Sequence, residues 1–201
     1  TGNGIGGDLF AIVWSAKENK LYGLNASGRS PKKLTLEFFK ENNYDAIPAY
    51  GPLPVSVPGC VDGWFSLHEK FGTLKMSDIL KPTIDYAEKG FPMTELIGYY
   101  MDLASKRFKD YPNFASTYMD NGRTPKKGEI FKNPYLASTL KVIAQNGRNG
   151  FYKGPIAKSI SDFIKKQGGF LSEDDLKSHK SNWIEPVSVN YRGFDVWELP
   201  P

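Results

Sequence analysis

The sequence predicts a fold of α/β or α+β class, and we adopt α+β, in which a helical region lies between two pairs of strands. Three observations carry this prediction. Strand-like apolar patterns occur near both ends of the 201 residues, and about half a dozen stretches with helical spacing lie between them. Hydrophobic residues make up 40% and charged residues 24%, which is the composition of a globular rather than a disordered protein.

The first pair of strands is predicted close to the N-terminal end. Leu9–Val13 is a continuous apolar run, which indicates a strand buried on both faces, and Leu21–Leu24 forms the second strand of a hairpin. Residues 25–31 are rich in Asn, Ser and Gly and therefore predict a loop. A short helix is expected over 34–40, and the proline-rich segment 48–59 is expected to be extended and irregular.

The middle of the chain is predicted to be helical. Apolar spacing predicts a helix over 61–71, and Ser77 is expected to cap a helix over 79–89 with Pro82 in its first turn. Further helices are predicted to begin at four start signals, which are Thr94, Pro134, Pro155 and the capping box of Ser172. Alternating residues on either side of Arg192-Gly193 predict a second hairpin. We expect one fragment over 1–201, with a hairpin and loop in 1–30, a mainly helical region in 60–180 and a hairpin in 186–199.

Charge and composition exclude several classes of function. The 26 basic residues are scattered among 22 acidic ones, so no basic patch for nucleic acid is expected. No apolar run approaches the roughly 20 residues that a membrane helix needs. A single cysteine, Cys60, excludes an internal disulfide and a CxxC metal site, and the distant His68 and His179 make a zinc site improbable. We expect neither a metal nor a cofactor.

Two features at the start of the chain resemble functional motifs. Gly2–Gly7 matches GxGxxG, but a dinucleotide loop needs a strand before it and a helix after it, and here a strand follows. A kinase glycine loop is excluded because the other kinase motifs are missing. We therefore expect a tight glycine turn whose amides are bonded by Asp8. Thr1 could serve as an N-terminal nucleophile, but we interpret it as the edge of a longer chain.

Three other residues invite a catalytic interpretation. Cys60 follows Pro58-Gly59 at a helix start, where a thiolate would be stabilised, but it adjoins an apolar helix face and is expected to be buried and structural. His68 is expected to be a satisfied helix histidine, and His179 a surface residue near a helix end. No Ser/His/Asp set can be assembled from the sequence.

Three groups of motifs, in this order and spacing, resemble the large subunit of the γ-glutamyltranspeptidase family. The first is a glycine-rich GIGGDLF segment followed by a hairpin, and the second is SVPGCVDGW with KFG, LKPTI and AEKGFP. The third is FYKGPIA with GGFLSEDDL, YRGF and LPP. These motifs lie at 4–10, 56–92 and 151–201.

The resemblance implies an N-terminal-nucleophile hydrolase with a four-layer αββα fold. In this family a precursor cuts itself into two subunits, and the new N-terminal threonine of the small subunit attacks a γ-glutamyl amide with its own α-amine as base. Water or an amine then takes the acyl group. The resemblance therefore implies a small-subunit partner and no catalytic residue in this chain, which we expect to be an internal fragment that is inactive alone.

The resemblance also points to substrate-binding residues in the loop after the second strand. Family members carry an arginine there that clamps the α-carboxylate of the glutamyl group. Alignment on Leu24 and Pro31 places Ser27 at that position, with Arg29 two residues later and on the same face of an extended backbone. Arg29 could equally be a surface arginine or the partner of an acid. The Ser-Gly-Arg form resembles the transpeptidase-like and acylase-like branch.

Three functions remain open at this stage. The first is transfer or hydrolysis of the γ-glutamyl group of glutathione-like amides. The second is an acylase with another specificity, such as glutaryl amides. The third is a non-catalytic relative that acts as a scaffold or binding protein, and a threonine nucleophile in the rest of the precursor would distinguish the enzymes from it.

Overall fold

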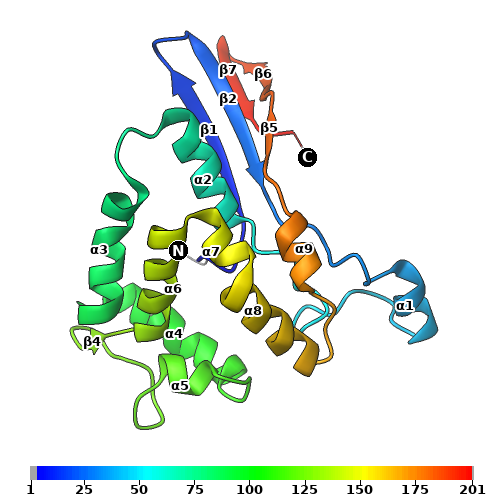
Figure 1. The fold of residues 1–201 in the computed structure, drawn as a ribbon, viewed down its shortest axis with the longest axis vertical. Coiled ribbons are helices and arrows are strands. Elements are labelled where there is room, and N and C mark those ends of the chain that lie inside the picture. Colours follow the sequence, from blue (N-terminus) through cyan, green and yellow to red (C-terminus); the bar gives the residue numbers. More distant parts are fainter. Residues whose placement is uncertain (1–3, 201) are drawn as a thin grey trace. The chain divides into compact units, whose positions relative to one another are not determined.

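The computed structural model describes residues 4–200, and these form two compact units. The first unit combines the chain up to Thr73 with the segment from Asn146 onward, and the second holds Leu74–Gln145. Helices and strands both contribute, as the α+β prediction requires (Figure 1). That these residues act as one large-subunit fragment stays a prediction.

The first unit is built on a three-stranded antiparallel sheet in the order β1-β2-β5. The predicted hairpin is confirmed, with β1 at Leu9–Ser15 and β2 at Lys20–Ala26 paired from Leu9↔Ala26 to Ser15↔Lys20. The short strand β5, Asn182–Ile184, pairs with β2 and was not predicted.

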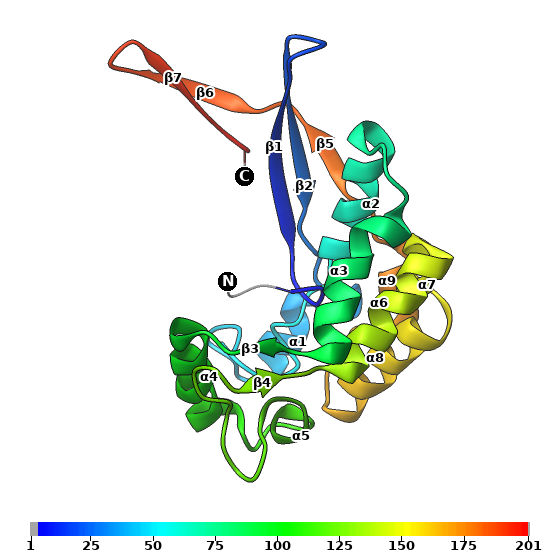
Figure 2. The same ribbon diagram turned by 90° about the vertical axis from the view of Figure 1, so that its left-hand side faces the viewer.

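The two faces of this sheet differ in burial. One face carries the fully buried Leu24 and Ala26 and packs on α2, Cys60–Phe71 (Figure 2). The opposite face of β1 carries Phe10, Ile12 and Trp14, which are 59%, 42% and 57% exposed. The prediction that the first strand is buried on both faces is therefore wrong, because within the described residues only one face of β1 is covered.

Four further helices belong to the first unit, and two of their start signals are confirmed. The helices are α1 (Leu36–Glu41), α7 (Arg148–Tyr152), α8 (Gly154–Lys166) and α9 (Glu173–Ser178). Ser172 and Asp175 form the predicted capping box of α9, and Pro155 lies in the first turn of α8. The single-turn α7 was not predicted, since five residues give too little periodicity.

The second predicted hairpin is also confirmed, with β6 at Val187–Tyr191 and β7 at Phe194–Glu198. Its turn holds Arg192 and Gly193 at φ 54° and 85°, which is the region that a two-residue hairpin loop requires. Every residue of both strands is exposed, and the hairpin projects away from the three-stranded sheet (Figure 2).

The second unit is mainly helical. It contains α3 (Met76–Lys89), α4 (Glu95–Phe108), α5 (Phe114–Tyr118) and α6 (Pro134–Asn146), with a two-residue ladder between β3 (Phe91–Pro92) and β4 (Ile130–Phe131). Thr94 caps α4 as predicted, and Gly90 ends α3. Across residues 4–200, no helix combines the length and the apolar character needed to cross a bilayer.

The predicted start of α3 is wrong. The N-cap is Lys75, whose carbonyl oxygen accepts from the amides of Asp78 and Ile79 at 2.9 and 3.1 Å, so Ser77 lies inside the helix. Because the helix begins earlier than predicted, Pro82 falls in its second turn rather than its first.

Candidate functional site

The loop after β2 is fixed along its backbone at three successive residues. The Asn25 Oδ1 atom accepts from the Ser27 amide at 2.9 Å, and the Asp8 Oδ1 atom accepts from the Gly28 amide at 2.7 Å. The carbonyl oxygen of Arg29 accepts from the Val57 amide at 3.0 Å. Side chains at these positions are therefore presented from a backbone that has little freedom to move.

Two glycines permit the close approach of this loop to the segment that precedes α2. A Cβ atom on Gly28 would lie 1.7 Å from the Val57 carbonyl oxygen, and one on Gly59 would lie 2.0 Å from the Ala26 carbonyl oxygen. Both distances are far below van der Waals contact. Any side chain at either position would push the loop away from residues 57–59.

Ser27 and Arg29, the two residues predicted to bind substrate, both lie in this fixed loop. Ser27 is half-buried and Arg29 is exposed. Among residues 4–200 no hydrogen bond or ion pair engages the Arg29 guanidinium, so it is not the partner of an acid there. A guanidinium in this state can bind a carboxylate with two parallel hydrogen bonds. The substrate-binding role of both residues stays a prediction.

The glycine-rich segment forms a tight turn, closed by a hydrogen bond of 3.0 Å from the Gly7 amide to the Gly4 carbonyl oxygen. The Gly7 carbonyl oxygen accepts from the amides of Gly59 and Cys60 at 3.0 and 2.9 Å, so the turn is tied to the start of α2. Asp8 was expected to bond amides of this turn, and its carboxylate bonds the amide of Gly28 in the loop after β2. The first two residues of the GxGxxG match and Thr1 lie outside the described residues.

Cys60 is buried, with 6% of its surface exposed, as the sequence predicts. Burial, followed by the negative charge of Asp8, raises the pKa of its thiol. The cysteine is therefore protonated and enclosed, which is the state of a structural residue rather than of a nucleophile.

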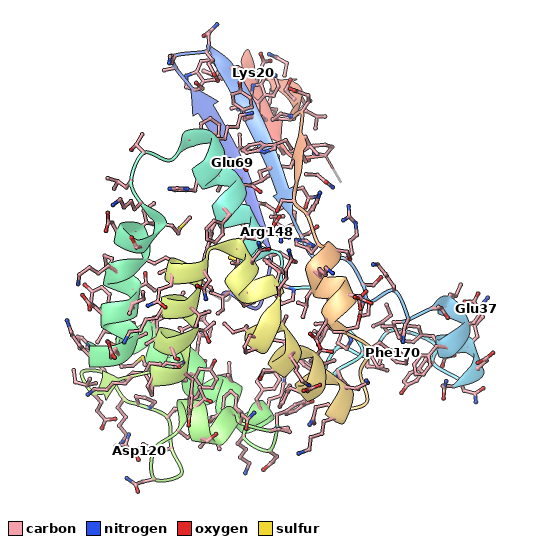
Figure 3. The ribbon with its side chains drawn as sticks, in the orientation of Figure 1. Lys20, Glu37, Glu69, Asp120, Arg148 and Phe170 are labelled. Carbon is pink, nitrogen blue, oxygen red and sulfur yellow. The ribbon has the colours of Figure 1, made fainter. Side chains whose placement is uncertain are left out.

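A buried charged cluster lies beside the loop, where α7 meets the start of α2 and the end of α9 (Figure 3). The Asp62 carboxylate accepts from the Ser181 amide at 2.6 Å, from the Ser181 hydroxyl and from Arg148 Nε. Burial raises the pKa of Asp62, but the hydrogen bonds from Ser181 and Arg148 outweigh it and hold the pKa below its usual range. Asp62 is thus a buried anion whose charge is compensated.

Tyr152 is fully buried and joins this cluster to the start of α2. Its hydroxyl donates to the Pro58 carbonyl oxygen at 2.6 Å and accepts from the Asp62 amide at 3.0 Å. The Arg148 guanidinium lies 4.4 Å from the centre of its ring, and the His179 ring stacks on it at 5.7 Å. Burial raises the pKa of the Tyr152 phenol, so the hydroxyl keeps its proton.

The prediction that His179 is a surface residue is wrong. The residue is 3% exposed, because the chain turns inward after α9 and its ring packs on Tyr152. Burial lowers the pKa of His179, and the Arg148 and Arg29 charges lower it further, against the opposing charges of Asp62 and Asp8. Within the described part of the chain its Nε2 atom has no hydrogen-bond partner. His68 lies within α2, as predicted.

The sequence motifs did not predict this cluster. Asp62 and Arg148 are 86 residues apart, and neither belongs to a motif that signals an ion pair. An acid between Val61 and Gly63 at the start of an apolar helix face was the one available signal. Residues 4–200 also contain no group of three His, Cys, Asp or Glu side chains arranged to hold a metal ion.

Comparison with known proteins identifies the family of this chain. The family model described as Gamma-glutamyltranspeptidase matches residues 1–201. A relative from Bacillus subtilis, "Glutathione hydrolase-like YwrD proenzyme", is 34% identical over 98% of this chain and 38% of its own length. "Glutathione hydrolase 3" of Arabidopsis thaliana is 30% identical over 99% of the chain and 31% of its own length.

Solved structures agree with the sequence comparison. Cephalosporin acylase from Bacillus halodurans superposes with a TM-score of 0.93 at 41% identity, over 99% of this chain and 38% of that one. The γ-glutamyltranspeptidase of Helicobacter pylori gives 0.91 at 31% identity, over 98% and 57%. The chain spans about a third of the length of these curated relatives, from 31% to 38%. From its sequence and its fold, this chain belongs to the γ-glutamyltranspeptidase family.

Proposed function

We propose that this chain is the large-subunit portion of a γ-glutamyltransferase-like enzyme that moves an acyl group from an amide to water or an amine. The family match over the whole chain and the proenzyme names of its relatives support this proposal. The observation that carries the chain's own part is the guanidinium of Arg29, which has no hydrogen-bond or ion-pair partner among residues 4–200 and lies on a loop with a fixed backbone.

In this account the nucleophile is a threonine of a companion polypeptide from the same precursor. Its hydroxyl attacks the amide carbonyl, and its α-amine takes the hydroxyl proton and passes it to the leaving amine. The resulting acyl ester is then cleaved by water or by an acceptor amine, which regenerates the threonine. No cofactor or metal takes part in this proposal, and this chain supplies no reacting atom.

The chain's contribution is to hold the acyl donor. The guanidinium of Arg29 donates two hydrogen bonds to the carboxylate of the acyl group, and the Ser27 hydroxyl lines the same side of the pocket. Orientation of this kind accelerates the reaction only if the supporting backbone stays in place. The hydrogen bonds from the Gly28 amide to the Asp8 carboxylate and from the Val57 amide to the Arg29 carbonyl oxygen provide that support.

The companion polypeptide is proposed to cover the apolar surfaces that the first unit leaves exposed. Phe10, Ile12 and Trp14 line the open face of β1, and β6 and β7 expose further large apolar side chains. Covering such a sheet face with a second sheet would complete a four-layer αββα arrangement. Removal of these side chains from water favours the association by about 25 cal/mol per Å² of apolar surface.

The test replaces Arg29 with lysine in the complete precursor. Lysine keeps the charge but cannot form the two-pronged contact with a carboxylate, so KM for a γ-glutamyl donor should rise about tenfold, the equivalent of roughly 1.4 kcal/mol. The matched control is Arg123→Lys, because Arg123 pairs with Glu129 on the surface of the second unit. An unchanged KM in Arg29→Lys removes Arg29 from the donor site.

A second candidate is an acylase with another specificity. The superposition on cephalosporin acylase at 41% identity favours it, and Arg29 could bind the terminal carboxylate of a glutaryl chain equally well. The ratio of kcat/KM for γ-glutamyl and glutaryl p-nitroanilides separates the two. A preference of tenfold or more for the glutaryl compound assigns the chain to the acylases. The isolated chain is expected to turn over neither compound.

A further inference from the structure

We propose that Tyr152 is a positioning residue for Arg29. It acts through residues 57–59, against which the loop after β2 packs. The inference rests on the proposed function, because it assumes that Arg29 binds the acyl donor. Tyr152 lies in α7, far along the chain from this loop, and none of the sequence motifs assigns it a role. The connection between Tyr152 and Arg29 runs through two sets of contacts.

The first set fixes the start of α2. Its N-cap is Gly59, which offers no side chain to bond the free amides of the first helical turn. The Gly7 carbonyl oxygen bonds the Cys60 amide at 2.9 Å, and the Tyr152 hydroxyl accepts from the Asp62 amide at 3.0 Å and donates to the Pro58 carbonyl oxygen at 2.6 Å. One buried hydroxyl thus holds both sides of the bend at which residues 57–59 enter the helix.

The second set transmits this position to the loop. The Val57 amide donates to the Arg29 carbonyl oxygen at 3.0 Å. Gly28 and Gly59 bring backbone against backbone so closely that a Cβ atom at either would lie 2.0 Å or less from a carbonyl oxygen. A displaced Pro58 carbonyl therefore shifts Val57 and Gly59, and these shift the backbone that carries Arg29.

The Tyr152 ring is held independently of its hydroxyl. The Arg148 guanidinium lies 4.4 Å from the ring centre, the His179 ring stacks on it at 5.7 Å, and Phe151 contacts it edge-on at 5.0 Å. Tyr152→Phe therefore keeps the packing of the ring and removes only the bridging hydroxyl. This makes the phenylalanine variant a specific probe of the bridge.

The test compares four forms of the complete precursor after maturation, which are wild type, Tyr152→Phe, Arg29→Ala and the double variant. Donor KM is measured with γ-glutamyl p-nitroanilide, and kcat is expressed per active site from the acylation burst. We expect Tyr152→Phe to raise KM at least threefold with kcat within twofold of wild type. In the Arg29→Ala background the same substitution should change KM by less than twofold, since the arginine it positions is gone.

The matched control is Tyr22→Phe, which removes a hydroxyl that donates to Glu18 in the same unit but away from the loop, and it should leave KM unchanged. If Tyr152 had a general structural role, Tyr152→Phe would lower kcat, or it would raise KM by the same factor in the Arg29→Ala background as in the wild type. Either result overturns the inference. If Arg29→Ala raises KM and Tyr152→Phe does not, the inference alone fails. If Arg29→Ala leaves KM unchanged, the proposed role of Arg29 fails and the inference falls with it.

Amide exchange in the wild-type enzyme gives a readout that needs no variant. The bonded amides of Val57 and Asp62 should exchange at least tenfold more slowly than the amide of Arg192 in the exposed turn between β6 and β7. Fast exchange of both amides contradicts the bridge and overturns the inference.

Discussion

Asp62→Asn removes the buried anion of the first unit and leaves its partners in place. The carboxylate has 6% of its surface exposed and the Arg148 side chain 26%, so solvent screens this pair little. Asparagine preserves the shape but offers one acceptor oxygen to the three donors on Arg148 and Ser181, and its NH₂ group faces one of them.

The expected cost follows from this burial. Removing one partner of a buried ion pair leaves the other charge uncompensated, which costs about 3–5 kcal/mol. We take the lower end, about 3 kcal/mol, because Arg148 keeps its bond to the His179 carbonyl oxygen. For a folding unit of 150–250 residues this loss lowers the unfolding midpoint by roughly 6–12 °C. Thermal unfolding followed by tryptophan fluorescence measures it, with Asp85→Asn as the control that removes an exposed carboxylate paired with Lys81 and Lys89.

The pH dependence provides a second check on the same residue. Since the folded-state pKa of Asp62 lies below its unfolded value, its contribution is fully present above about pH 4–5, and it is lost as the pH falls through the folded pKa. The gap between wild type and Asp62→Asn should therefore be constant near neutrality and shrink in acid. Two results would show that Asp62 is not a stabilising buried anion. One is a midpoint shift no larger than that of Asp85→Asn, and the other is a difference between wild type and Asp62→Asn that persists undiminished at pH 2.

Three further predictions concern residues near the loop. Gly28→Ala should destabilise the protein by about 1–3 kcal/mol, seen as a lower unfolding midpoint, whereas a Cβ atom at Gly6 meets no atom of residues 4–200 within 4 Å and Gly6→Ala should not. Burial lowers the folded-state pKa of His179, so the unfolded chain takes up a proton first as the pH falls. The unfolding free energy should therefore decline below about pH 6.5, and this decline should be smaller in His179→Gln than in a His68→Gln control. The Cys60 thiol should react with a disulfide reagent at least a hundredfold faster in denaturant than in the folded protein, and rapid labelling of the folded form would contradict its burial.

Local signals in the sequence predicted most elements of the fold correctly. The alternation around Arg192-Gly193, the capping box at Ser172 and the proline of α8 each act over a few residues, and the structure confirms all three. The short β5 carries no comparable signal, because its three residues are a strand only by pairing with β2.

The errors in predicted burial have a common physical origin, since burial depends on contacts between distant parts of the chain. Val13 and its neighbours form a continuous apolar run, yet one face of β1 is uncovered in the described residues. His179 follows a polar helix end, yet it is enclosed by residues from α7. The cluster of Asp62, Arg148 and Ser181 was missed for the same reason, because its members come from three separate segments.

The candidate site was predicted from resemblance rather than from chemistry visible in the residues. Ser27 and Arg29 were singled out by alignment, and the structure adds that their loop is bonded at consecutive backbone positions and that no acid within 4–200 pairs with Arg29. Of the glycines that allow this arrangement, Gly59 belongs to the second group of motifs and Gly28 to the Ser-Gly-Arg form of the loop. Their steric role became evident only once the Gly28 and Gly59 contacts were known.

The central claim is that this chain frames an acyl-transfer reaction whose nucleophile lies on a companion polypeptide. The most direct measurement is intact-mass spectrometry of the mature enzyme, quenched in acid during turnover of a γ-glutamyl or glutaryl amide. We predict that the acyl mass is found on the companion fragment, at its N-terminal threonine, and that the polypeptide containing these 201 residues is unmodified. An acyl group on this polypeptide, at Ser27, Cys60 or any other residue, would contradict it.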